Sequence, residues 1–296
     1  MKLSIVFLNY NRVAETRYTL EQLSRLVNNR DDIEVIAVDN GSSDGTKEFL
    51  QTQTSWVHVI SIADNTGIAG YNQGFKLAKG DYILVLDDDS HPVDNITLDR
   101  MIHHLDTRPD IGIVACRIES ANGERFQTWH LPEDDIATTS MAFVACGFTI
   151  RRSLFEKIGW YPEDFFLYQN EMEVAIKVLQ QDYKIYYDPQ CRVVHRQAPQ
   201  GRTGWRQVYY PTRNSIWLIR RYVPYPGAAY LIASRLFFGL IRAVQSLEIK
   251  CYYQAMRDAF TTPIKAEKLS KSVRKQLTIF WRQNSFWHQL TGKVRN

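Results

Sequence analysis

Three consecutive carboxylates follow an apolar run in Gly80-Asp81-Tyr82-Ile83-Leu84-Val85-Leu86-Asp87-Asp88-Asp89-Ser90. The apolar run is typical of a strand buried on both faces of a sheet. In open α/β sheets, ligands bind at the carboxyl ends of the strands. Carboxylates this close repel one another unless a cation lies beside them, and a hard divalent cation suits them. The stretch equally fits a solvated acidic turn whose Asp or Ser caps the next helix.

The segments before residue 80 alternate between strands and helices. The predicted strands cover Leu3–Leu8, Ile33–Val38 and Val57–Ile62, and the segments between them have helical spacing of apolar residues. This alternation indicates a parallel, right-handed α/β sheet. Each strand ends in a polar loop, so one rim of the sheet is rich in Asn, Asp, Gly and Ser.

This polar rim can hold a nucleotide through backbone amides and short side chains. Its candidate residues are Asn9, Asn11 and Arg12 after the first strand, Asp39 after the second, and Asn65, Gly67, Gly70 and Asn72 after the third. The carboxylate of Asp39 can accept hydrogen bonds from a nucleobase or ribose. No GxGxxG follows the first strand and no GxxxxGK[ST] occurs, which argues against dinucleotide and P-loop sites. The pattern Gly67-x-x-Gly70 by itself equally fits an ordinary turn.

Composition and charge limit the class of protein. The chain has 296 residues, 45% of them apolar and 23% charged, as in a globular protein with a substantial core. Its formal charge of +4 is too small to indicate nucleic acid. The basic residues gather near the end of the chain, which points to an anionic surface, either phospholipid or nucleic acid. We expect no nucleic-acid partner, because no nucleic-acid-binding motif is recognisable.

Cysteine usage and hydropathy indicate a cytoplasmic protein. The four cysteines have no CxxC spacing, which is typical of buried thiols in a reducing compartment; they are Cys116, Cys146, Cys191 and Cys251. The sequence starts with a strand and not with a signal peptide. Its most apolar segment, Ala228–Ile241, is interrupted by Arg235, so we expect no membrane span.

The second half of the chain supplies two further candidates. Strands are predicted over Ile111–Cys116, Phe143–Ile150, Lys184–Asp188 and Arg192–Val194, the last ending at His195. Glu171 lies in the first turn of a predicted helix that runs to about Gln181, where the helix dipole favours its charge. It lies off the apolar stripe of that helix, as a residue facing a pocket would. Glu173 and Lys177, four residues apart, are expected to form a surface pair.

The order of these motifs resembles family 2 glycosyltransferases with the GT-A fold, especially the rhamnosyltransferase-like branch. The resemblance spans about residues 3–225. Its motifs are Val6 to Arg12, Val38 to Thr46, Asn65 to Gly74, Leu86 to Ser90, Gly147 to Tyr161, Phe165 to Glu173, and Val194-His195. It implies an α/β GT-A catalytic domain over residues 1–205, with a nucleotide-binding half (1–110) and an acceptor half (111–205). Residues 206–296 would form a basic, aromatic helical extension.

The resemblance also implies roles for particular residues. Asp39 would contact the nucleobase and Asp87 the ribose, with Asp88 beside them. Asp89 and His195 would hold Mn²⁺ or Mg²⁺ at the diphosphate of a nucleoside-diphosphate sugar. Glu171 would act as general base in an inverting transfer to a hydroxyl of a saccharide or lipid-linked acceptor. The donor would be dTDP-rhamnose or a UDP-hexose, and the pathway synthesis of a cell-surface polysaccharide.

One departure from the family pattern affects the base. The family has Glu-Asp before this helix, and this chain has Asn170-Glu171. Glu171 inherits the position of the base with one extra methylene, while Asn170 removes a charge. The alternative to an active enzyme is therefore a catalytically weakened nucleotide-sugar-binding module in a larger assembly.

Two regions near the C-terminus leave alternatives open. Residues 197–205 form either a lid in which Arg202 or the following Arg206 touches the diphosphate or an ordinary surface loop. A helical run is expected from Ala228 to Phe260, in which Leu231, Arg235, Phe238 and Arg242 can make an amphipathic helix. That helix either lies in a membrane interface, at the inner face of the cell membrane, or packs on protein, including a second copy of the chain.

Overall fold

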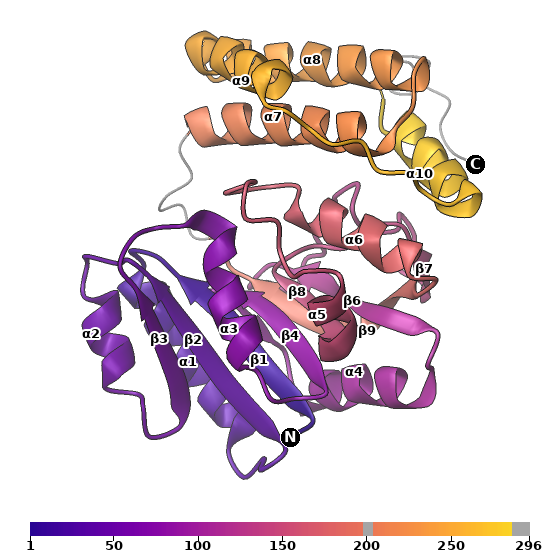
Figure 1. Cartoon of the computed structure of the whole chain (residues 1–296). Helices are drawn as coiled ribbons and strands as arrows, with labels where there is room; N and C mark the ends of the chain where they lie inside the picture. Colours follow the sequence, from indigo (N-terminus) through magenta and orange to yellow (C-terminus); the bar gives the residue numbers. More distant parts are fainter. Residues whose placement is uncertain (198–203, 286–296) are drawn as a thin grey trace. The chain divides into compact units, whose positions relative to one another are not determined.

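The computed structural model describes residues 1–197 and 204–285, which belong to two compact units (Figure 1). The first unit comprises Met1–Phe166 and Asn170–Gln200, and the second Leu167–Gln169 and Gly201–Asn296. The division lies near the predicted boundary after residue 205. The short segment Leu167–Gln169, which belongs to the second unit, was not foreseen.

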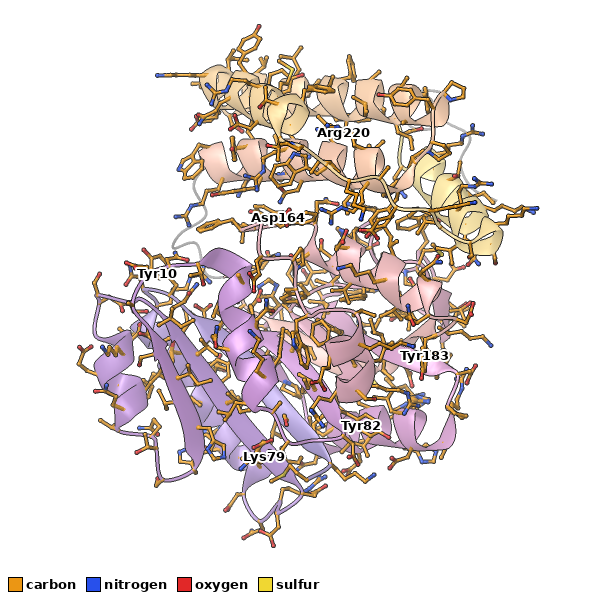
Figure 2. All side chains as sticks on the ribbon, viewed as in Figure 1. Tyr10, Lys79, Tyr82, Asp164, Tyr183 and Arg220 are labelled. Atoms are coloured by element: carbon orange, nitrogen blue, oxygen red, sulfur yellow. The ribbon has the colours of Figure 1, made fainter. Side chains whose placement is uncertain are left out.

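Four parallel strands form the first half of the sheet in the first unit. They are β1 (Leu3–Asn9), β2 (Ile33–Asn40), β3 (Val57–Ile62) and β4 (Tyr82–Asp87), in the order β3-β2-β1-β4. The register pairs Asn9 with Asp39 and Leu8 with Asp87, so their polar ends lie at one edge. Figure 2 shows Tyr10, which follows β1, at the edge opposite Tyr82, where β4 begins. The predicted parallel sheet is present.

Short helices connect these strands. They are α1 (Val13–Val27), α2 (Thr46–Gln51), the 3₁₀ turn η1 (Gly67–Gly70) and α3 (Tyr71–Leu77). Helix α1 buries Leu20 and Leu23, which its apolar spacing predicted. Helix α4 (Asn95–Thr107) follows the acidic stretch and is capped by Asp94, whose side chain accepts a hydrogen bond from the Thr97 backbone N–H.

The remaining strands make the sheet mixed. Strands β6 (Ile111–Glu119) and β9 (Lys184–His195) run parallel, with β8 (Gly147–Arg151) antiparallel between β4 and β6. Two short strands, β5 (Ser90–Pro92) and β7 (Thr138–Ser140), pair with β9 and were not predicted, because three residues carry no periodicity. The two strands predicted near residues 184 and 192 are one strand with an irregularity after Asp188. Helices α5 (Arg152–Lys157) and α6 (Asn170–Gln180) complete this unit.

The second unit is helical, as predicted for the end of the chain. It contains α7 (Gly204–Tyr222), α8 (Gly227–Gln245), α9 (Ile249–Thr261) and α10 (Lys271–Gln283). The single helical run expected from Ala228 to Phe260 is wrong, since Leu247 has a φ of 58° and separates α8 from α9. Val208, Ala243 and Tyr252 form a small buried core between α7, α8 and α9.

Helix α8 also corrects the expectation that no segment is long and apolar enough to span a membrane. By length and composition, it meets that criterion, and among the described residues it is the one helix that does. The core helix of a soluble protein meets the same criterion, and 33% of the most apolar window of α8 is buried. Leu231, one of the residues named for the amphipathic helix, is buried, while Leu240, Ile241 and Val244 are exposed.

Candidate active site

The acidic stretch turns sharply after β4. The backbone N–H of Asp87 donates to Oγ of Ser90 over 2.8 Å, and this hydroxyl also donates to the Cys146 carbonyl over 3.0 Å. The Asp89 side chain is fully buried and that of Asp88 is 8% exposed, whereas that of Asp87 is 40% exposed. The alternative of a solvated acidic turn is therefore wrong for Asp88 and Asp89.

Strand pairing brings His195 to these carboxylates. Ser90 of β5 lies opposite His195 of β9 in the antiparallel register. Nε2 of His195 is consequently 3.1 Å from Oδ1 of Asp89 and 3.8 Å from Oδ2 of Asp87. Two carboxylates and an imidazole are ligands that suit Mn²⁺ well. The predicted pair Asp89 and His195 thus lies together.

Cys146 joins this cluster, which the sequence did not indicate. Antiparallel pairing of Leu86 with Gly147 places it beside β4, and the potential ligand atoms of Asp87, Cys146 and His195 lie within 4.8 Å of one another. Burial raises the pKa of the Cys146 thiol. A neutral thiol is a poor ligand for a hard cation, so the carboxylates and His195 are the better donors.

The site holds more carboxylates than nearby cations. Nη1 of Arg12 lies 2.9 Å from Oδ1 of Asp88 and 3.4 Å from Oδ2 of Asp89. Burial, partly offset by Arg12, and the neighbouring charges of Asp89 and Asp87 together raise the pKa of Asp88 to about 7. Burial alone would lower the pKa of His195, but Cys146, Asp89 and Asp87 together raise it to about 11. Such shifts are typical of a site that accepts an additional cation.

Asp39 lies at the same edge of the sheet, at the end of β2. Its side chain is fully buried, and Oδ1 accepts a hydrogen bond from the Ser42 backbone N–H over 3.3 Å. Oδ2 has no hydrogen-bond partner among residues 1–197 and 204–285. A buried carboxylate oxygen without a donor is costly unless a ligand supplies one. The position therefore suits an N–H or O–H group of a nucleoside.

The side chains of the asparagines predicted to bind the donor make hydrogen bonds within the protein. Asn9 donates to the Val38 carbonyl, and Asn65 accepts from the backbone N–H of Gly67. Asn72 donates to the backbone carbonyl of Tyr161 and accepts from its N–H, each over 3.1 Å.

Asn11 accepts from the backbone N–H of Ser43 over 2.7 Å and has a φ of 53°. These contacts give Asn9, Asn11, Asn65 and Asn72 a structural role in the rim, and their contact with the donor stays a prediction.

The packing around the two glycines of the third loop leaves little room for a side chain at either position. Gly67 has a φ of 64°, and a Cβ atom there would lie 2.1 Å from the backbone oxygen of Phe166. A Cβ atom on Gly70 would lie 2.8 Å from Oδ1 of Asn40. Close packing against neighbouring atoms gives both glycines a structural role, and their contact with the donor stays a prediction.

Glu171 lies in the first turn of α6 and is 9% exposed. Oε1 of Glu171 is 3.2 Å from Nε2 of His130. The chain reaches α6 through three residues in the left-handed region, Phe166 (59°), Tyr168 (65°) and Gln169 (68°). Such backbone strain is often found at functional sites, where the surrounding structure holds it in place.

Tyr161 is buried and lies within range of the charges of Glu171 and Asp87. Burial raises its pKa well above the ordinary value, and the carboxylates of Glu171 and Asp87 raise it further, so both act on one hydroxyl. Tyr71 packs edge-on against Tyr161 at 5.7 Å and donates its own hydroxyl hydrogen bond to Oδ1 of Asp87 over 3.0 Å. Neither tyrosine was predicted, because aromatic residues in these segments are as typical of core packing as they are of a functional site.

The prediction for Glu173 is wrong in part, and the prediction for Arg202 is not tested. Glu173, expected in a surface pair with Lys177, is fully buried, although the two lie 3.3 Å apart. Its burial follows from α6 packing both sides of its first turns into the protein. Arg202 and most of the candidate lid lie outside the described residues.

The mixed nine-stranded sheet with an acidic site at the ends of β1, β2 and β4 defines a GT-A type α/β protein. The family model "Glycosyl transferase family 2" matches residues 4–174, and the chain belongs to this family. The resemblance seen in the sequence is thereby confirmed at the level of the family.

Curated relatives are distant glycosyltransferases. The probable glycosyltransferase YdaM of Bacillus subtilis (strain 168) is 24% identical over 75% of this chain, and the uncharacterized glycosyltransferase YwdF of the same organism is 28% identical over 66%. The chain spans 57% of the length of YdaM and 74% of that of YwdF. The O-antigen biosynthesis protein RfbC of Myxococcus xanthus is 23% identical over 44% of this chain, which spans 12% of RfbC.

Solved structures confirm the predicted fold. The mannosyltransferase PcManGT of Pyrobaculum calidifontis, in complex with GDP-Man and Mn²⁺, is 18% identical to this chain and has a TM-score of 0.63. The superposition covers 95% of this chain and 85% of the PcManGT chain. S. aureus TarS 1–349, in complex with UDP-GlcNAc, is 16% identical with a TM-score of 0.62, covering 100% and 93%. At these identities, the likeness concerns the fold.

Proposed function

We propose that this glycosyltransferase moves a sugar from a nucleoside-diphosphate donor to a hydroxyl of a saccharide or lipid-linked acceptor, with inversion at the anomeric carbon. The observation that carries the proposal is the position of His195, 3.1 Å from Asp89 at the sheet edge where β2 ends in the buried carboxylate of Asp39. Asp39 would accept a hydrogen bond from the nucleobase, and Asp87 would face the ribose or the metal.

The residues at this edge fit a divalent cation, Mn²⁺ or Mg²⁺. Asp87, Asp89 and His195 would hold it, since their oxygen and nitrogen atoms are the donors such ions prefer. A bound ion would offset the charge of the leaving diphosphate. Arg12, paired with Asp88 and Asp89, would fix the position of these carboxylates and limit their repulsion.

Glu171 is the proposed general base. It would accept the proton of the attacking hydroxyl, while the nucleoside diphosphate leaves from the opposite side of the sugar. The low exposure of Glu171 and its proximity to His130 restrict its orientation. Tyr161 packs on Tyr71, which donates a hydrogen bond to Asp87, and the charge of Glu171 raises the pKa of Tyr161; this proximity supports a place for the acceptor near the donor site.

The choice of sugar follows the resemblance. We propose dTDP-rhamnose or a UDP-hexose as the donor, as in the rhamnosyltransferase-like branch. Synthesis of a cell-surface polysaccharide is the proposed pathway, and its support is the similarity to a relative named for O-antigen biosynthesis. A cytoplasmic location and a homodimer stay predictions.

A panel of nucleotide sugars tests the activity through release of nucleoside diphosphate. We expect turnover of one donor class with Mn²⁺ or Mg²⁺ and its loss on chelation. Glu171→Gln should lower kcat by roughly 10²- to 10⁴-fold and leave donor affinity intact. Donor binding with no turnover in either protein would favour the alternative of a weakened binding module, which Asn170 in place of the family acid suggests. Absence of donor binding would refute both.

A further inference from the structure

A basic groove lies within the second unit, lined by the turn that joins α7 to α8 and by helix α10. Figure 1 labels these helices. Its volume is about 450 Å³. Four of its residues are cations on α10, and two are exposed apolar side chains; they are Lys271, Arg274, Lys275, Arg282, Tyr225 and Ile279.

Helix α10 has two distinct faces. Val273, Leu277 and Trp281, spaced by four residues, are buried in the second unit. Lys271, Lys275 and Arg282 lie at positions i, i+4 and i+11, which fall on one other face. No acidic residue occurs in α10, so its outer face has only positive charge.

The four cations have no acidic partner among the described residues. No hydrogen bond or ion pair of these side chains is present among residues 1–197 and 204–285. The stretches outside these residues contain no Asp or Glu. Within Gly204–Ser285 the acids are Glu248, Asp258 and Glu267; the first two pair with Cys251 and with Tyr209 and Arg257. This concentration of unpaired charge favours an anionic partner.

The apolar residues decide between the classes of anionic partner. Tyr225 is 74% exposed and Ile279 is 48% exposed at the border of the groove, and α8 exposes Leu240, Ile241 and Val244 along one face. Exposed aliphatic side chains beside cations are stabilised in a lipid interface, where the apolar group enters the acyl boundary and the cation meets phosphate. A nucleic-acid backbone offers no such environment for Ile279.

We propose that this groove docks on a membrane surface rich in anionic phospholipids, with the α10 cations at the headgroup phosphates and Tyr225 and Ile279 below them. Docking would bring the enzyme to a lipid-linked acceptor, but the contact itself does not depend on the proposed activity and can fail separately. No bond is formed or broken in this step.

Sedimentation of the full chain with lipid vesicles tests the contact. We expect binding to phosphatidylcholine vesicles that contain phosphatidylglycerol, weaker binding to pure phosphatidylcholine, and a decrease at high salt. The double substitution Lys271→Gln/Lys275→Gln should weaken binding by roughly fivefold per cation. Tyr225→Ser/Ile279→Ser should reduce the part of the binding that persists at high salt.

Matched variants keep the result interpretable. Lys47→Gln/Lys76→Gln makes the same change of net charge on exposed residues of α2 and α3 and should leave binding unchanged. Arg274→Gln/Arg282→Gln repeats the test on the same groove if the first variant loses its circular dichroism signal. Equal weakening by the control pair, no binding to anionic vesicles, or preference for duplex DNA over vesicles with the same dependence on α10 would overturn the proposal.

Discussion

Nε2 of His130 lies 3.2 Å from Oε1 of Glu171, and Nδ1 of the same ring lies 3.1 Å from the Thr128 hydroxyl. The ring also stacks on Trp129 with centroids 3.9 Å apart. Both side chains of the His130–Glu171 pair are largely buried, with 16% and 12% exposure. In the family pattern, an acid precedes the base, and here Asn170 takes that position while an imidazole contacts Glu171.

This contact predicts that His130 orients Glu171. His130→Phe should lower kcat by about 10- to 100-fold with little change in donor KM, because Glu171 would lose the polar group 3.2 Å from its carboxylate, and misplacement of a catalytic group by about 1 Å can cost about 10²-fold in rate. His130→Gln, which keeps a polar group beside the Glu171 carboxylate, should recover much of the rate. The pH profile of kcat should also change shape in His130→Phe. Equal losses in both variants, with an unchanged profile, would assign His130 a packing role only.

Donor affinity should depend on the buried carboxylate of Asp39. Asp39→Asn keeps the size of the side chain but removes the charged acceptor, so binding of the nucleoside diphosphate should weaken by roughly 10- to 100-fold. Calorimetric titration measures this directly. The exposed Asp64 in the next loop offers a control, and Asp64→Asn should bind normally. Normal affinity in Asp39→Asn would contradict the nucleoside contact.

Removal of His195 should separate metal binding from folding. His195→Ala leaves the carboxylates of Asp87 and Asp89 in place but removes a nitrogen donor, so Mn²⁺ should bind at least about tenfold more weakly. Electron paramagnetic resonance of free Mn²⁺ gives the affinity without reference to turnover. His103→Ala, at an exposed position on α4, serves as the comparison. If the two variants bind Mn²⁺ alike, His195 is not a ligand.

Gly67 should be intolerant of any side chain. Gly67→Ala places a Cβ atom 2.1 Å from the Phe166 backbone oxygen, in the segment that leads to Glu171. We expect the free energy of unfolding to fall by about 1–3 kcal/mol more than the positive φ alone would cost, and kcat to fall as well. Gly45→Ala has similar φ strain (93°) but meets no atom within 4 Å, so it isolates the steric effect. Urea unfolding that is identical for the two variants would rule out the clash.

Acid stability should depend on Asp188. Burial alone would raise its pKa, but the backbone N–H of Gln190 and the side chains of His104 and Arg100 lower it below the ordinary value of 3.8. A lowered pKa in the folded state means that stabilisation is present above about pH 4 and is lost as pH falls below it. Thermal unfolding across this range should show the loss.

The substitution Asp188→Asn measures the same interaction at neutral pH. Loss of the charged acceptor of the hydrogen bond from Arg100, which is 35% exposed and can still meet solvent, should cost about 1.5–3 kcal/mol, or roughly 3–12 °C in Tm. The exposed pair of Asp110 with Lys184 lies 2.9 Å apart, and Asp110→Asn should change Tm far less. A Tm for Asp188→Asn within the range of that control would show that the buried pair contributes little.

Much of the first unit was predictable because its signals are local. The apolar run Tyr82–Leu86 and the strands before it encode buried parallel strands through side chains a few residues apart. Their polar ends meet at one edge because parallel strands share a direction, so Asp39 and Asp87 fall together without further information. Helices α8 and α9 show the limit, since a single left-handed residue, Leu247, divides a continuous helical pattern.

The sequence by itself determined the parallel strands, the acidic end of β4 and the family, since short-range periodicity and ordered motifs carry that information. Tertiary structure alone decided that β5 pairs with β9 and sets His195 against Asp89, and that β8 places Cys146 beside Asp87. It also decided that His130 meets Glu171 and that Glu173 is buried. These contacts join residues distant in the chain, and their formation depends on packing free energy summed over the whole unit, which no local pattern records.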